Sequence, residues 1–267
     1  MTTKQILPKL PSVGLTNERP SDRELGMGQL LLLDRTLMYG LFFVLIFGVL
    51  AFGCVEDWSS FGFELGGLGL FITWSVQQLL SRRVRLSLTP LYLPAFLFLA
   101  LILIQLSLHK SAYAYATRYE VLRYVAYGIV LLVTAECLKT KQSRKRFALL
   151  LTVFGAFYAF FAVIQDLTSN GKIFWLRPVH FPGGIFGTYV NRDHYAGLME
   201  MLLPIPLTIS FSHLLRGEKR FLVGFCGVLM AGTIFLCGSR GGMIAFMVEM
   251  VLLAILTFSE SRRFPVR

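Results

Sequence analysis

The chain has 267 residues, 55% of them hydrophobic and 15% charged, and its mean hydropathy is +0.64. A soluble domain rarely carries so many apolar residues, and several stretches of about 19 or 20 residues without a charge are long enough to cross ~30 Å of hydrocarbon. This composition excludes a soluble globular protein and predicts an all-α, polytopic transmembrane helical bundle.

The uncharged stretches divide the chain into about eight expected spans. Residues 1–35 are expected to form a cytoplasmic N-terminal tail, residues 36–259 the transmembrane helical domain, and residues 260–267 a cytoplasmic end. The longest connection within the domain is an expected outer loop, 166–193. The expected spans are Thr36–Val55, a second that ends near Leu80, Pro90–Leu108, Tyr119–Leu138, Phe147–Gln165, His194–Leu215, Phe221–Ser239 and Gly241–Ser259.

The net charge of +11 is explained by where the basic residues lie. Most of the 26 Lys and Arg residues fall in the N-terminal tail and in the connections after the second, fourth, sixth and eighth spans. Cytoplasmic loops collect such residues, so both termini are expected in the cytoplasm and the long loop outside. The charge is therefore expected to reflect membrane topology, with membrane lipids as neighbours and no nucleic acid as a partner.

The first motif stands where the outer loop enters the sixth span, and it reads Asn191-Arg192-Asp193-His194. The first N–H groups of a helix lack partners and carry a partial positive charge, so an arginine added there suits a phosphate or diphosphate. An alternative stays open, in which Asn191 or Asp193 only caps the helix and Arg192 reaches toward lipid head groups.

The second motif, GSRGG over 238–242, lies in the tight connection between the seventh and eighth spans. Its glycines permit a close backbone approach, and a purely structural turn has no need of the permanent cation on Arg240. Ser239 and Arg240 are therefore candidates for ligand binding at the same outer face as the first motif.

Ionisable residues at membrane depth indicate function by default. Glu200 in the sixth span is expected on the helical face of Asp193, whereas Glu249 in the eighth is more simply a packing residue. Arg123, near the outer end of the fourth span, is a candidate to line an anionic cavity. The four cysteines and the histidines have no metal-like spacing, so neither a metal nor another cofactor is expected.

The sequence GTYVNRDHYAGLMEMLLP, followed by TIFLCGSRGGMIAF, resembles the O-antigen ligase and O-antigen polymerase family of bacterial membrane glycosyltransferases. The resemblance implies a GT-C-like, metal-independent enzyme of the bacterial inner membrane. Its donor would be a polyprenyl-diphosphate-linked glycan and its acceptor a glycan or lipid A-core. The resemblance places Arg192 and Arg240 on the diphosphate. These two arginines and His194 are the predicted catalytic residues. The residues predicted to bind substrate are Asn191, Asp193, Ser239, Glu200 and Arg123.

Members of that family have further spans and a large outer loop that bears an essential histidine. The chain is therefore expected to be either the N-terminal portion of a longer protein, and a glycosyltransferase when completed by that part, or a natural short form without that activity. Two other functions stay open. One is a polytopic transporter or lipid-linked-glycan translocator, although the sequence shows neither the internal repeat nor the broken helices typical of one. The other is a non-catalytic partner in polysaccharide export.

Overall fold

The computed structural model describes residues 20–81, 86–178, 185–212, 215 and 217–263. Helices make up most of this chain, as the uncharged stretches predict. They are α1 (Pro20–Leu50), α2 (Asp57–Ser81), α3 (Tyr92–Ser107), α4 (Ala114–Cys137), α5 (Lys141–Thr168), α6 (Arg192–Leu202), α7 (Pro204–Phe211), α8 (Glu218–Leu236) and α9 (Arg240–Arg263), together with the short 3-10 helix η1 (Phe52–Cys54).

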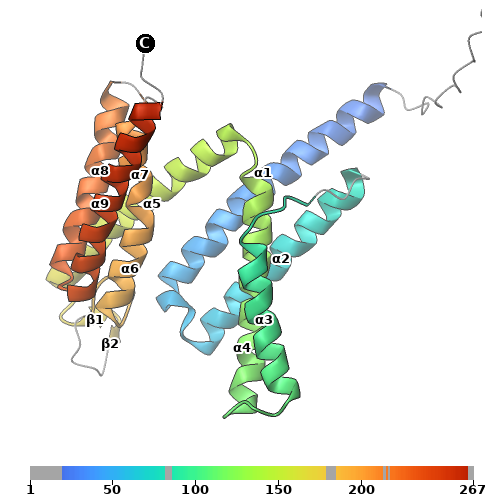
Figure 1. The fold of residues 1–267 in the computed structure, drawn as a ribbon, viewed down its shortest axis with the longest axis horizontal. Coiled ribbons are helices and arrows are strands. Elements are labelled where there is room, and N and C mark those ends of the chain that lie inside the picture. Colours follow the sequence, from blue (N-terminus) through green and yellow to red (C-terminus); the bar gives the residue numbers. More distant parts are fainter. Residues whose placement is uncertain (1–19, 82–85, 179–184, 213–214, 216, 264–267) are drawn as a thin grey trace, which may run out of the picture.

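The helices form two groups that meet where α1 contacts α5 (Figure 1). In the first group, α1 packs on α2, and α4 packs on α1, α2 and α3. Leu37, Leu41 and Val133 are buried at its centre. In the second group, α8 packs on α5, α6, α7 and α9, and the buried core includes Tyr195 and Met230. Both expected motifs belong to the second group.

Within the described residues, four helices are long and apolar enough to cross a membrane, in agreement with the expectation of a helical membrane protein. These segments are Gly28–Leu50, Lys141–Thr168, Glu218–Leu236 and Arg240–Thr257. Large apolar side chains on α9, such as Ile244, Val248 and Leu252, are exposed on its surface, where hydrocarbon would cover them. The apolar helix α3 has 16 residues, about 24 Å at 1.5 Å per residue. The count of eight spans stays a prediction.

One span boundary differs from the sequence-based expectation. Helix α1 begins at Pro20, so residues 20–35 of the expected tail continue as helix into the first span, while residues 1–19 lie outside the described chain. The expected sixth span, His194–Leu215, contains α6 and α7, which are separated only by Leu203. Because Leu203 has a φ of −60° and a ψ of −38°, the helical backbone continues from α6 into α7. Proline has no N–H to donate to the preceding turn, and Pro204 and Pro206 both interrupt the hydrogen-bond ladder there.

The end of the second group that carries the motifs also carries a small hairpin. Strands β1 (Lys172–Ile173) and β2 (Arg177–Pro178) pair antiparallel within the expected outer loop. Figure 1 shows this hairpin below the beginnings of α6 and α9, at the end of the group opposite the C-terminus. Residues 179–184 of the loop, including the histidine at position 180, lie outside the described chain.

Candidate functional site

Buried polar side chains hold the loop between α5 and α6 against the core just before α6 begins. The Thr188 hydroxyl donates to the Val49 carbonyl at 2.7 Å, the Thr188 N–H donates to the Tyr158 hydroxyl at 3.0 Å, and the two hydroxyls lie 2.7 Å apart. Gln165 donates to the Gly187 carbonyl and accepts from the Phe174 N–H at 2.7 Å. Since buried polar groups are costly to leave unpaired, this network fixes the path of the loop into α6.

A second set of contacts joins the loop to the segment between α1 and α2. Arg177 forms an ion pair with Glu56, and its guanidinium carbon lies 4.6 Å from the centroid of the Phe52 ring. The Tyr189 ring lies against Gly53, whose backbone φ is +70°. Burial raises the pKa of Tyr189 to about 12, so this phenol adds no negative charge beside the first motif at neutral pH.

Asn191 forms the N-terminal cap of α6. Its side-chain oxygen accepts a hydrogen bond from the Asp193 N–H at 2.9 Å, which is the ordinary arrangement for a capping asparagine. Of the two residues that the sequence offered as a helix cap, Asn191 is therefore the one that caps α6. Arg192 and His194 follow in the first turn, both with exposed side chains. The His194 ring centroid lies 6.4 Å from that of Tyr189.

Ser239 joins the two motifs, which lie 46 positions apart. Its side chain is buried, with 1% of its surface exposed, and its hydroxyl donates to Asp193 Oδ1 at 2.6 Å. The same hydroxyl accepts from the Gly242 N–H at 3.0 Å and so caps α9. One hydroxyl thus holds the beginnings of α6 and α9 together, and its only hydrogen is committed to Asp193.

Two glycines of the second motif make this approach possible. A Cβ on Gly242 would lie 2.6 Å from the Ala196 Cβ and 3.0 Å from Glu200 Oε1, far inside van der Waals contact. A Cβ on Gly238, which has a φ of +69°, would lie 3.5 Å from Nη1 of Arg192. The backbone of the second motif is therefore pressed against α6, and the Arg192 side chain lies over Gly238.

Each arginine of the pair stands next to one end of the connecting hydrogen bond. Arg192 is the first residue of α6 and precedes Asp193, while Arg240 is the first residue of α9 and follows Ser239. Both side chains are exposed, and within the described chain neither guanidinium makes a hydrogen bond or an ion pair. Two helix N-termini therefore meet at one end of the second group, each with an exposed arginine as its first residue, an arrangement suited to a multiply charged anion.

Farther along α6 and α9 than the two arginines, each helix carries a glutamate inside the bundle. Glu200 Oε1 and Glu249 Oε2 are buried and have no hydrogen-bond partner in the described chain, and the two carboxylates lie close enough to influence each other electrostatically. Glu200 also lies against Gly242. The structure therefore brings Glu200 to the junction of the two motifs, with Glu249 near it.

Arg123 lies in the other group of helices. Its guanidinium pairs with Glu120 at 2.9 Å on α4 and donates to the Ser60 hydroxyl at 2.9 Å on α2. The structure thus does not place it with the two motifs.

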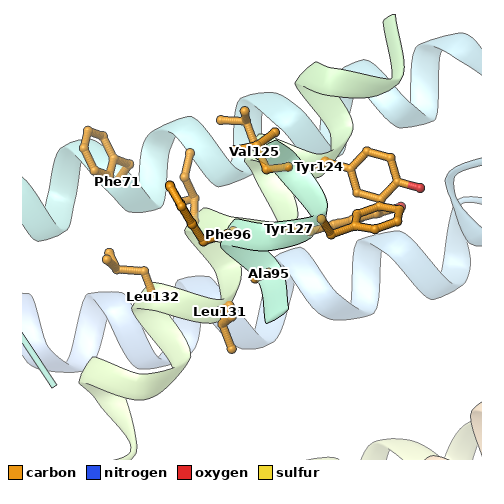
Figure 2. Close-up of a pocket in the computed structure, with 12 residues that line it drawn as sticks. Phe71, Ala95, Phe96, Tyr124, Val125, Tyr127, Leu131 and Leu132 are labelled. Atoms are coloured by element: carbon orange, nitrogen blue, oxygen red, sulfur yellow. The ribbon is translucent and has the colours of Figure 1, made fainter. Parts of the chain in front are cut away.

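A pocket of about 390 Å³ between α2, α3 and α4 is lined by apolar and tyrosine side chains, including Phe71, Phe96 and Tyr124 (Figure 2). None of the candidate site residues lines it.

The supporting residues Tyr158, Gln165 and Thr188 were not among the candidates from the sequence. Two of them are polar residues within the fifth expected span, and that position is the one signal that could have indicated them. Among the described residues, no group of three or more His, Cys, Asp or Glu side chains could hold a metal ion.

Comparison of the chain with protein-family models, with curated proteins and with solved structures gives no match.

Proposed function

We propose that this chain binds the diphosphate of a polyprenyl-linked glycan at the outer face of a bacterial inner membrane, as part of an O-antigen ligase or polymerase. The observation that carries the proposal is the Ser239–Asp193 hydrogen bond, which brings the two motifs together. It supports a diphosphate site because it brings together two helix N-termini, each of which begins with an exposed arginine.

In this proposal each residue has a separate task. Arg192 and Arg240 hold the diphosphate of the donor, and Asp193 and Ser239 fix the spacing of the two arginines. The bond between the anomeric carbon and the diphosphate oxygen breaks, and an acceptor hydroxyl of a glycan or lipid A-core forms the new bond to that carbon. The leaving diphosphate keeps the electron pair and is stabilised by the arginines. The hydroxyl proton passes to a base, for which the exposed imidazole of His194 and the carboxylate of Glu200 are the candidates.

The proposed membrane arrangement is a GT-C-like bundle of about eight spans with both termini in the cytoplasm. It is supported by the basic connections predicted to face the cytoplasm and by the common end at which the hairpin, α6 and α9 meet (Figure 1).

Single cysteines placed in a variant without the four native cysteines test this arrangement. We expect a membrane-impermeant thiol reagent to label positions 170 and 190 in intact cells, and to label positions 142 and 218 only after the membrane is opened. All four positions are exposed in the described structure. Labelling of position 142 in intact cells would reverse the orientation and place the arginines inside.

Ligand binding tests the function itself. We expect the purified chain in detergent to bind undecaprenyl diphosphate more tightly than undecaprenyl phosphate, because the second phosphate occupies the second arginine. The affinity for undecaprenyl diphosphate is expected to be about tenfold higher or more, because one additional charge-assisted hydrogen bond contributes ~1.5–3 kcal/mol. Equal affinity for the two lipids in a titration followed by thermal stability would contradict a diphosphate site.

A transporter or lipid-linked-glycan translocator is the second candidate, and one observation favours it. Glu200 on α6 and Glu249 on α9 each have a buried carboxylate oxygen without a hydrogen-bond partner in the described chain, and ionisable side chains inside membrane helices mark the pathways of transporters. Proteoliposomes loaded with a fluorescent lipid-linked glycan separate the two. Movement of the intact lipid between leaflets supports the translocator, whereas binding without movement supports the proposed donor site.

A further inference from the structure

A groove lies between the beginning of α5 and the length of α7, far from the two motifs. It has a volume of about 560 Å³. Helix α5 has 28 residues, about 42 Å at 1.5 Å per residue. The groove lies at its first residues, and the loop that leads to the two motifs follows its last. The lining residues are Lys141, Gln142, Arg144, Lys145, Ala148, Leu149, Pro204, Ile205, Thr208 and Ile209.

The charges along this groove all have one sign. Lys141, Arg144 and Lys145 come from α5, and residues three and four positions apart share one face of a helix. Among the described lining residues none is acidic. Lys141 and Arg144 are exposed and make no ion pair within the described chain. The beginning of α5, capped by Thr140, adds the positive end of a helix dipole.

The rest of the groove is apolar. Ala148 and Leu149 continue along α5, one to two turns beyond the cations, and Ile205 and Ile209 face them from α7. The groove also has Pro204, the first residue of α7, in its wall. A ligand that fills it therefore needs an anionic head at the beginning of α5 and an apolar portion beside α7.

We infer that this groove binds an anionic phospholipid, with its phosphate on Lys141, Arg144 and Lys145 and an acyl chain along Ala148, Leu149 and Ile205. Basic pockets between membrane helices select such head groups. A soluble anion would leave the apolar wall unused, and a nucleic acid has no apolar portion to occupy it. The inference depends on the membrane placement of the chain and not on the proposed diphosphate site.

The test compares two double variants that remove the same charge. Lys141→Gln with Arg144→Gln alters the groove, while Arg146→Gln with Lys219→Gln alters exposed cations outside it. Each variant is purified as the full chain in a neutral detergent and titrated with phosphatidylglycerol, with zwitterionic phosphatidylcholine and with undecaprenyl phosphate. The shift in unfolding temperature reports binding, and monodispersity on gel filtration confirms folding.

We expect phosphatidylglycerol to stabilise the unaltered chain and the control double variant equally, and phosphatidylcholine to have little effect. The groove double variant should bind phosphatidylglycerol about 25-fold more weakly, since each cation near an anionic head group contributes a factor of about five. Ala148→Leu, which keeps every charge and fills the apolar wall, should weaken binding as well. Equal losses in the two double variants would mean non-specific surface attraction and would overturn the inference. Stronger stabilisation by undecaprenyl phosphate than by phosphatidylglycerol would also overturn it.

Discussion

Replacing either Arg192 or Arg240 with alanine is expected to weaken binding of undecaprenyl diphosphate by about 10- to 100-fold, because a hydrogen bond to a charged group contributes about 1.5–3 kcal/mol. Both guanidiniums are exposed and unpaired within the described chain, so their removal leaves no buried partner behind and the fold should persist. In a glycan-transfer assay the same changes are expected to cost on the order of 10²–10³-fold in rate.

Replacing either arginine with lysine tests whether the positive charge alone is sufficient for binding. It keeps the cation but loses the planar fork that binds two phosphate oxygens at once, so an intermediate loss is expected. Arg118→Ala is the matched control, because Arg118 is an exposed arginine near the beginning of α4 and away from the two motifs. Unchanged affinity in the Arg192→Ala and Arg240→Ala variants, or an equal loss in the control, would remove the arginines from the site.

The helices were predictable because hydrocarbon demands long uncharged runs, and such runs are visible in the chain without any knowledge of packing. The effect of Pro204 was harder to predict. Membrane helices tolerate proline when neighbouring groups satisfy the freed carbonyls, so a proline in an apolar run does not by itself predict a break. Here Pro204 and Pro206 cannot donate to the preceding turn, yet Leu203 keeps helical angles and α7 follows α6 directly.

The site was predictable only in its parts. The sequence indicates that Arg192 begins a helix and that Arg240 follows a tight turn, since both follow from local chemistry. It does not indicate that Ser239 reaches Asp193, because that contact depends on how α6 packs on α9. For the same reason, the sequence could not show that Arg123 lies away from the two motifs. Its expected depth and side matched those of the motifs, but the packing of α4 on α2 gives it Glu120 and Ser60 as partners instead.

The close packing of α9 on α6 provides the sharpest test of the assembled site, because it separates the presence of the arginines from their spacing. Gly242→Ala adds a Cβ that would lie 2.6 Å from the Ala196 Cβ and 3.2 Å from the Ser239 hydroxyl oxygen. The Ala196 methyl group cannot rotate away, so the beginning of α9 must move from α6. Such overpacking costs about 1–3 kcal/mol in stability.

The neighbouring glycine gives a matched control. A Cβ on Gly241 meets no atom within 4 Å, and alanine is a better helix former than glycine, so Gly241→Ala should be neutral or slightly stabilising. Both variants keep Arg192, Arg240 and the net charge. We expect Gly242→Ala alone to weaken undecaprenyl diphosphate binding, by about tenfold or more, since a displacement near 1 Å is enough to impair a preorganised site. If the two variants bind the lipid equally well, the arginines act independently, and the contact between α6 and α9 does not set their function.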